Sequence, residues 1–251
     1  KGKWDERRLI SETWIDEATA RQTSNGSNPA SDWDQGYGYQ FWRCRNGAYR
    51  GDGAFGQYCV VFPAQDAVLV ITSGVRDMQS VLNVVWDKLL PAFQAATLPA
   101  DPAAHQKLAS ALAQLKVRTP KTAGKAVATM GKTFAFPANE RKIESLQISD
   151  AADDGATTMT LRVDGAAQRD VCGREAWRKG AVAWGRWPRQ PAGASGAWTA
   201  DDTFTAKIAF YETPFLATVQ LKFTGDEVRL QTESNVGFGP TTEPFLVGKV
   251  K

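Results

Sequence analysis

The chain has 251 residues, of which 43% are hydrophobic and 23% charged, as is typical of globular proteins and not of disordered ones. Its 30 basic and 27 acidic residues give a net charge of +3, which provides no reason to expect nucleic acid or an anionic membrane as a partner. No apolar run approaches the roughly 20 residues that cross a bilayer, so no membrane span is expected.

The first 95 residues predict a small sheet flanked by helices. The expected elements are a helix over 11–22, strands over 37–45, 57–62 and 68–72, and a helix from Met78 to about Gln94. Ser11 and Asp77 are suited to cap the two helices, and Asn46-Gly47 favours a hairpin turn after the first strand. Three antiparallel strands make a thin core, so we expect this partial sheet to continue in another segment.

Residues 96–130 have a different character. Asp101 and Pro102 favour the start of a short helix. The basic, small-residue stretch 116–130 predicts a solvated linker.

From residue 131 to residue 251 the pattern is all β. Short alternating segments are expected over 132–136, 143–148, 157–163, 169–172, 177–184, 203–211, 217–223 and 228–232. Turn pairs such as Asp164-Gly165 and Gly225-Asp226 separate them, at a spacing typical of an antiparallel barrel. The overall fold class is therefore α+β: a partial antiparallel sheet with flanking helices over 1–95, a short helix and linker over 96–130, and a barrel-like domain over 131–251. Four tryptophans, Trp177, Trp184, Trp187 and Trp198, either fill the barrel or line a ligand cavity.

The sequence contains few cysteines and histidines, the residues on which disulfides, zinc sites and histidine-based catalysis depend. Cys44, Cys59 and Cys172 are sparse and isolated, so we expect buried or semi-buried thiols and no disulfide framework. With one histidine, His105, in a linker-like region, neither a zinc site nor a Ser-His-Asp triad is expected. The sequence predicts no metal and no cofactor.

The stretch from Tyr49 to Gln57 is the strongest candidate for a site. Gly51, Gly53 and Gly56 would let the backbone approach a ligand closely. A phosphate loop is a poor interpretation, because no Gly-Lys-Ser/Thr follows and the next element is a strand.

These residues also carry a family resemblance. GYGYQFW (36–42), GDGAFGQ (51–57), a strand ending at Pro63, a turn at Asp66 and a strand ending in Thr72-Ser73 resemble the C-terminal end of serine hydrolases of the beta-lactamase and penicillin-binding-protein family. Nylon-oligomer hydrolases and related esterases have this Gly-x-x-Gly-Gln form. The resemblance covers residues 1 to about 94, including GKW near the start, Arg8-Leu-Ile-Ser11 and Trp14.

The resemblance implies a site that is incomplete in this chain. Such enzymes acylate the serine of Ser-x-x-Lys, assisted by Tyr-x-Asn or Ser-x-Asn, and none of these motifs occurs here. The third family motif falls on Gly51-Asp52-Gly53, where glycine replaces the basic residue. The Ala54 N–H would be an oxyanion-hole donor, and Gly51, Asp52, Gly53, Gly56 and Tyr39 are the candidate substrate-binding residues. The alternatives are a turn role for Asp52 and a core role for Tyr39.

The leading hypothesis is the C-terminal fragment of a serine hydrolase that cleaves ester, amide or peptide bonds through an acyl-enzyme. Alone, the chain is expected to be inactive. Its expected partner is the N-terminal half of the same protein or a second copy, with a small-molecule or peptide substrate for the whole enzyme. The alternatives are a non-catalytic binding or regulatory protein on the same scaffold, or a barrel that binds a small apolar ligand. The sequence does not assign a compartment.

Overall fold

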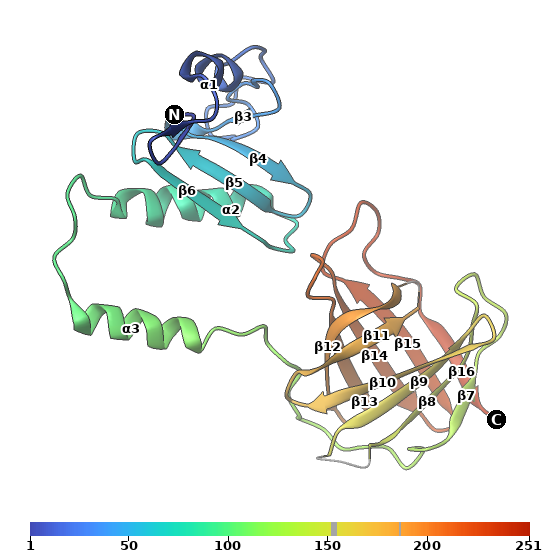
Figure 1. Ribbon diagram of the computed structural model, residues 1–251. Helices are drawn as coiled ribbons and strands as arrows, with labels where there is room; N and C mark the ends of the chain where they lie inside the picture. The colour runs from blue at the N-terminus through green and yellow to red at the C-terminus, as the bar shows by residue number, and fades with distance from the viewer. Residues whose placement is uncertain (152–154, 186) are drawn as a thin grey trace. The chain divides into compact units, whose positions relative to one another are not determined.

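The computed structural model describes residues 1–151, 155–185 and 187–251. The chain divides into two compact units, Lys1–Leu108 and Ala109–Lys251 (Figure 1). With 41% strand and 15% helix, the molecule is mostly β. Among the described residues, no helix combines the length and the apolar character that a membrane span needs.

Unit 1 is built around a four-stranded antiparallel sheet. Its elements are β1 (Lys3–Trp4), β2 (Arg7–Arg8), α1 (Glu12–Thr19), β3 (Trp42–Arg43), β4 (Tyr49–Gly53), β5 (Gln57–Phe62), β6 (Ala67–Ile71) and α2 (Met78–Val84). The sheet order is β3-β4-β5-β6. The side chains of Tyr58, Val60 and Phe62 alternate along β5 toward the core, where they meet Leu82 and Trp86 of the α2 segment.

Both helices are capped by the residues expected from the sequence. The Ser11 Oγ accepts a hydrogen bond from the Trp14 N–H at 3.2 Å, and the Asp77 Oδ1 accepts one from the Ser80 N–H at 3.1 Å. The second helix is less regular than expected, because α2 continues through a π-helical turn (Val85–Leu89) and a 3-10 turn (Leu90–Ala92).

The sheet of unit 1 differs from the expected three strands. The segment 37–45 contains only the short β3, since Gln40 (φ 66°) interrupts the extended backbone. The glycine-rich stretch Tyr49–Gly53 is itself a strand, pairing with β5 from Tyr49↔Val61 to Gly53↔Gln57. Asn46 and Gly47 do adopt the positive φ angles expected of the turn between β3 and β4.

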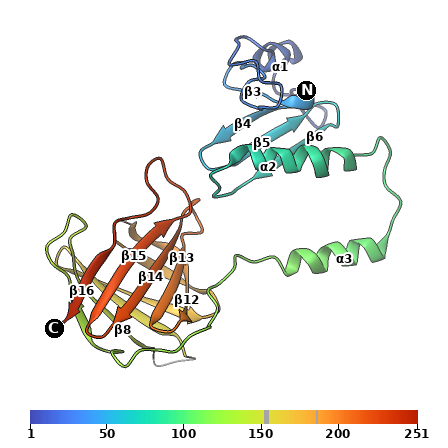
Figure 2. The ribbon, with the colours of Figure 1, turned by 180° about the vertical axis from the view of Figure 1, so that it is seen from behind.

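Unit 2 contains a closed nine-stranded barrel, which confirms the barrel expected from the sequence (Figures 1 and 2). Its strands are β7 (Thr133–Ala135), β8 (Ile143–Asp150), β9 (Thr157–Val163), β10 (Ala166–Arg174), β12 (Trp187–Ala200), β13 (Thr203–Ala209), β14 (Leu216–Thr224), β15 (Glu227–Ser234) and β16 (Leu246–Val250). An additional strand, β11 (Arg178–Trp184), pairs with the first half of β12.

The barrel closes where β10 meets β12. Gly173 and Arg174 pair in parallel with Ser195 and Gly196, whereas every other ladder of this sheet is antiparallel. A ring of alternating strands needs one parallel pair when the number of strands is odd, and here that pair is the closure. The strands β12 and β16 were not expected from the sequence.

The segment before the barrel is not a solvated linker, contrary to expectation. The Trp177 Nε1–H donates to the Val117 carbonyl at 2.8 Å, and the Thr122 N–H donates to Glu175 Oε1 at 2.9 Å. The Ala123 and Gly124 amides both donate to the Trp198 carbonyl. Residues 117–125 are thus a strap held on the barrel wall, so the stable body of unit 2 begins before residue 131. Between the two units, α3 (Pro102–Ala113) crosses the boundary with all its residues exposed.

The barrel interior is packed with apolar side chains. Trp184 and Trp187 belong to its core and Trp198 packs against that core at Phe204 and Phe223, whereas Trp177 holds the strap. This packing favours the core role of these tryptophans over the lining of an apolar cavity. Of the three free cysteines, Cys44 and Cys172 are buried as expected, but Cys59 is exposed, because it lies on the face of β5 opposite the core.

Candidate functional site

The glycine-rich strand β4 presents two different faces. Arg50 and Asp52 alternate on the side of the unit 1 core, while Gly51 and Gly53 face the other way, opposite Cys59 and Gln57 of β5. A β-carbon on Gly51 would meet nothing within 4 Å, and one on Gly53 would make only ordinary contact with Gln57. Packing therefore does not require these two glycines. They leave the outer face of β4 bare, with room for another molecule to approach the backbone.

The edge of β4 is also open along these residues. β3 pairs only with Tyr49 and Arg50, so its ladder stops before Gly51. Backbone groups at an unpaired strand edge can hydrogen-bond to an extended ligand. The open segment runs from Gly51 to Gly53 and leads directly to Ala54, which is exposed.

Asp52 is held in place by its neighbour on the strand. The Arg50 Nε donates to Asp52 Oδ2 at 3.0 Å, and the Arg50 Nη2 lies 2.9 Å from the same oxygen as an ion pair, without hydrogen-bond geometry. The Arg50 side chain is fully buried and that of Asp52 is 12% exposed. A carboxylate bound in this way is a structural anchor and a poor candidate for proton transfer.

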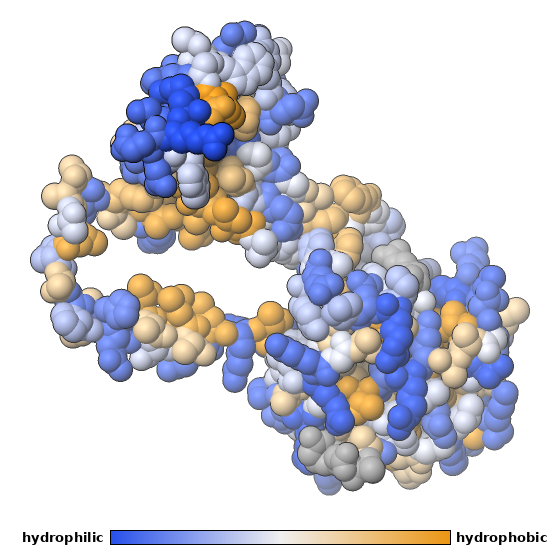
Figure 3. Space-filling view, in the orientation of Figure 1, coloured by the Kyte–Doolittle hydropathy of each residue, from blue (hydrophilic) through white to orange (hydrophobic). Residues whose placement is uncertain are grey.

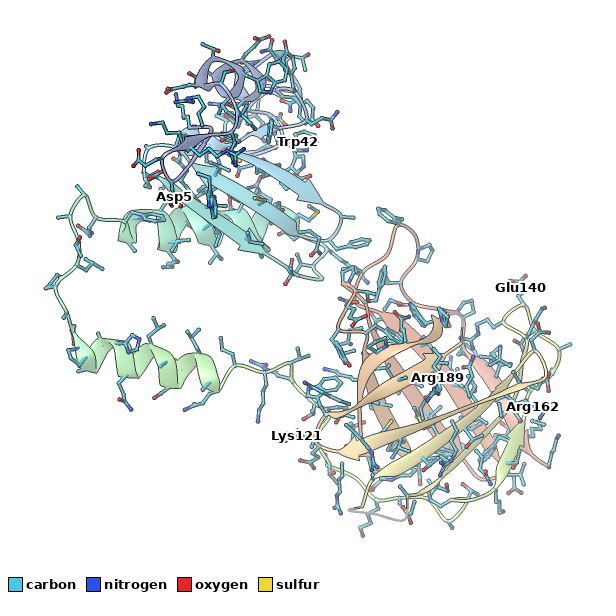
Figure 4. All side chains as sticks on the ribbon, in the orientation of Figure 1. Asp5, Trp42, Lys121, Glu140, Arg162 and Arg189 are labelled. Atoms are coloured by element: carbon cyan, nitrogen blue, oxygen red, sulfur yellow. The ribbon has the colours of Figure 1, made fainter. Side chains whose placement is uncertain are left out.

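Arg50 itself is enclosed by aromatic rings. Its guanidinium carbon lies 4.6 Å from the centre of the Trp33 ring, 5.6 Å from Trp42 and 6.0 Å from Tyr58 (Trp42 is labelled in Figure 4). Its Nη1 donates to the Asp32 carbonyl at 2.9 Å. These contacts compensate for the cost of burying the cation and fix the position of β4.

A second buried acid, Asp32, completes this network. Its carboxylate accepts hydrogen bonds from Trp86 Nε1 at 2.8 Å, Gln79 Nε2 at 2.7 Å, and the Arg45 amide and Nε at 2.8 and 3.0 Å. Burial alone would raise the pKa of Asp32, but these donors outweigh burial and hold its pKa below the ordinary value. Nothing in the sequence marked Asp32 as buried, because its donors come from residues 13 to 54 positions away.

The turn after β4 is locked by Ser73. Phe55 and Gly56 have φ angles of 69° and 91°. The Ser73 Oγ lies 2.7 Å from the Gly56 carbonyl and 3.0 Å from that of Phe55, close enough to donate to either. The Gln57 Nε2 donates to the Ser73 carbonyl and, at 3.3 Å, to that of Ala54. Gly56 and Gln57 therefore shape the turn that carries Ala54.

Tyr39 belongs to a different part of unit 1. Its hydroxyl donates to Glu17 Oε1 at 3.1 Å, and its ring centre lies 5.8 Å from that of Trp14 in α1. Hydrogen bonding to Glu17 raises the pKa of Tyr39. The described contacts of Tyr39 are thus with α1 and not with Gly51–Gly56.

The hollows of unit 1 lie beside the glycine-rich strand and not on its open segment. One, of about 450 Å³, is lined by α1, Tyr49 and the β5–β6 turn, including Asp16, Arg43 and Asp66. A second, of about 440 Å³, is an apolar groove between β6 and the α2 segment, lined by Leu69, Ile71, Val81, Val84, Val85, Lys88 and Leu89. We call this second hollow the β6 groove.

Within the described ranges, no three His, Cys, Asp or Glu side chains gather as a metal site. The lone His105 lies on the exposed helix α3. Comparison with known proteins gives no match to any family model, curated protein or solved structure.

Proposed function

We propose that unit 1 is the C-terminal part of the substrate-binding sheet of a beta-lactamase-like serine hydrolase, and that the nucleophile lies on another polypeptide segment. The observation that carries the proposal is the open edge Gly51–Gly53, whose outer face carries no side chain and which leads into an exposed Ala54. In a hydrolase of this kind, the edge would align an extended acyl substrate, and the Ala54 N–H would stabilise the oxyanion. One such donor contributes about 3–4 kcal/mol to transition-state stabilisation.

The rigidity of the strand supports this role. Arg50 and Asp52 anchor β4 from inside, and Ser73 fixes the turn from outside. A donor aimed at a transition state must be held in position before the reaction, since reorganisation would reduce its contribution. The lack of a basic residue at Gly51 favours neutral esters or amides over substrates with a carboxylate at this position.

The edge of the sheet at β6 supports the interpretation that unit 1 is an incomplete part of a larger domain. β6 ends the sheet, and no partner strand follows it in the described chain. Val68 and Val70 of β6 are 62% and 68% exposed on one face of the sheet, and the apolar β6 groove lies along Leu69 and Ile71 on the opposite face. Figure 3 shows apolar residues at the surface of this part of unit 1. An exposed, apolar edge strand is normally paired or covered, so we expect a strand and a helix from the remainder of the hydrolase to cover this side.

The test uses the complete reading frame in which residues 1–251 occur. The purified product is incubated with p-nitrophenyl acetate and with a fluorophosphonate probe, and the labelled residue is identified by mass spectrometry. Labelling of a serine outside residues 1–251, with loss of turnover in Gly53→Val but not in the surface variant Asp164→Asn, is the expected result. Labelling of a serine within residues 1–251, or full turnover in Gly53→Val, would contradict the proposal.

A further inference from the structure

β10 and β11 of the barrel lie next to each other but share no hydrogen-bond ladder among the described residues. β10 pairs with β9 along its length and with β12 only at Gly173 and Arg174, while β11 pairs with β12 alone. The Gln168 side chain spans the gap, accepting from the Gly185 amide at 3.1 Å and donating to the Gly185 carbonyl at 3.5 Å. We call the boundary between residues 168–172 and 181–185 the seam.

Asp170 lies at the middle of the seam, on the interior side of β10. It is 3% exposed, and its neighbours on the interior side are the fully buried Cys172 and, across the ladder to β9, Met159. Neither carboxylate oxygen has a hydrogen-bond partner. Burial raises the pKa of Asp170 to about 6; the Ala183 amide and Arg189 of β12 oppose this shift but complete no hydrogen bond with the carboxylate (Arg189 is labelled in Figure 4).

The isolation of Asp170 contrasts with the other buried acid of the chain. Asp32 is buried to the same degree, yet Trp86, Gln79 and Arg45 all donate to it. Among the described residues, the approach of the Ala183 amide is the one donor contact of the Asp170 carboxylate, and it falls short of full hydrogen-bond geometry. Such a carboxylate is unfavourable in the interior, because it accepts hydrogen bonds only and has lost those of water. A group that brought donors and a positive charge to Asp170 would relieve this cost.

We propose that the seam is the mouth of a binding site in which the Asp170 carboxylate binds the ammonium group of a small alkylammonium ligand. An ammonium group offers three donors and the compensating charge. The side chains beside Asp170 on the interior side, Met159 and Cys172, are apolar and packed, so an unbranched alkyl chain would enter against them only as the seam opens. The single acid makes a metal ion a poor occupant, since no cluster of three ligating residues is found in the described chain. The ligand reaches the site when the Gln168 bridge releases, because no ladder has to break at the seam.

The experiment measures binding of n-hexylammonium chloride to the full chain by titration calorimetry at pH 8. Matched probes are n-hexanol, which lacks the charge, and sodium hexanoate, which reverses it. Saturable one-to-one binding of the ammonium is expected, at least tenfold tighter than that of either probe. In Asp170→Asn the affinity should fall at least tenfold, whereas Asp164→Asn, an exposed acid on the β9–β10 turn, should bind like the original chain. In Arg189→Gln, which removes the nearby cation, binding should be as tight or tighter.

Two further measurements separate a binding role from a structural one. The indole N–H resonance of Trp184, identified through Trp184→Phe, should shift on titration, and the affinity of the original chain should weaken as the pH falls below about 6, when Asp170 becomes protonated. Thermal unfolding must show that Asp170→Asn is folded, which is expected since the variant removes a buried charge. Absence of saturable binding, equal affinity for hexanol, or undiminished affinity in folded Asp170→Asn would overturn the proposal.

Discussion

The hydroxyl of Ser73 occupies the space that a β-carbon on Gly56 would need, at 2.2 Å from the ideal position of that carbon. The same hydroxyl lies within hydrogen-bonding distance of the Gly56 carbonyl. Two residues 17 positions apart are thus fitted to each other, and the segment that follows β6 sets the shape of the turn between β4 and β5.

The first prediction concerns this fit. Gly56→Ala should lower the free energy of unfolding of unit 1 by about 2 kcal/mol or more, because it adds both a clash and an unfavourable positive φ. Gly51→Ala is the matched control and should be nearly neutral, since its side chain would meet nothing within 4 Å. Calorimetric scans of the full chain provide the measurement. An unchanged unit 1 transition in Gly56→Ala would show that the turn is not locked as described.

The second prediction concerns the anchor of β4. Asp52→Asn should cost about 2 kcal/mol, because it leaves the buried Arg50 guanidinium without a charged partner; the slight exposure of Asp52 keeps the loss below the roughly 3–5 kcal/mol typical of fully buried pairs. Asp164→Asn breaks the exposed pair with Lys142 and should cost less than about 1 kcal/mol. Urea titration compares the two. Equal losses would mean that the burial of Arg50 does not depend on its ion pair.

The third prediction is that acid affects the stabilising contributions of Asp32 and Asp170 in opposite directions. The pKa of Asp32 is lowered in the folded state, so its contribution is present at neutral pH and is lost as the pH falls through that lowered pKa. The pKa of Asp170 is raised to about 6, so folding takes up a proton between the ordinary value, 3.8, and 6. The contribution of Asp170 to the stability of unit 2 should therefore decrease as the pH rises through that window.

Difference measurements isolate these two acids from the other titrating groups. Thermal unfolding at pH 3 to 8 should show that Asp170→Asn gains most over the original chain above pH 6. Asp32→Asn should lose most at neutral pH and least in acid. Parallel pH profiles for a variant and the original chain would exclude the corresponding acid as the origin of the effect.

The fourth prediction tests the strap. A fragment of residues 109–251 should fold and unfold cooperatively, whereas a fragment starting at residue 131 should be less stable, because it lacks the amides that bind Glu175 and Trp198. The loss of several hydrogen bonds at roughly 1 kcal/mol each predicts a clear decrease in the unfolding temperature. Amide spectra and thermal scans of both fragments decide this. Equal stability would restore the interpretation of residues 116–130 as a solvated linker.

The fifth prediction concerns the open edge of unit 1. The chain alone should self-associate as its concentration rises, since β6 presents unpaired backbone and exposed valines. Val70→Lys should reduce this association, because a lysine on an edge strand opposes strand pairing. Sedimentation at several concentrations provides the measurement, with Lys249→Glu in the barrel as a surface control. A chain that stays monomeric throughout would show that this edge is stable in water.

Local patterns in the sequence were enough to predict some strands but not others. The sequence predicted the bounds of β5 and β9 to the residue. Along β5 the more buried and less buried positions alternate regularly, whereas β9 begins with three buried residues and is marked by its β-branched residues and by the turn that follows it. β12 has no such pattern: Pro188, Pro191, Gly193 and Gly196 all disfavour strands, and tertiary pairing with three neighbours overrides their propensities.

The candidate site was predictable in the same limited sense. The glycines at 51, 53 and 56 drew attention to this stretch of the chain, but the strand Tyr49–Gly53 and the ion pair of Arg50 with Asp52 were not expected. The donors to Asp32 and the fit of Ser73 against Gly56 were not, because they join residues far apart in the sequence. The seam could not be predicted either, because the absence of a hydrogen-bond ladder between two strands has no signature in the local amino-acid composition.

The pairing of β7 with β16 has a consequence for how this protein is made. Phe134 pairs with Val250, so the strand that begins the barrel has its neighbour within the final residues described. During synthesis, β7 leaves the ribosome long before its partner exists, and its exposed edge must wait for the rest of the barrel. A chain that ended at Phe245 would lack β16, and this would leave the edges of both β7 and β15 open. A nascent chain without β16 would therefore be a target for chaperones and proteases.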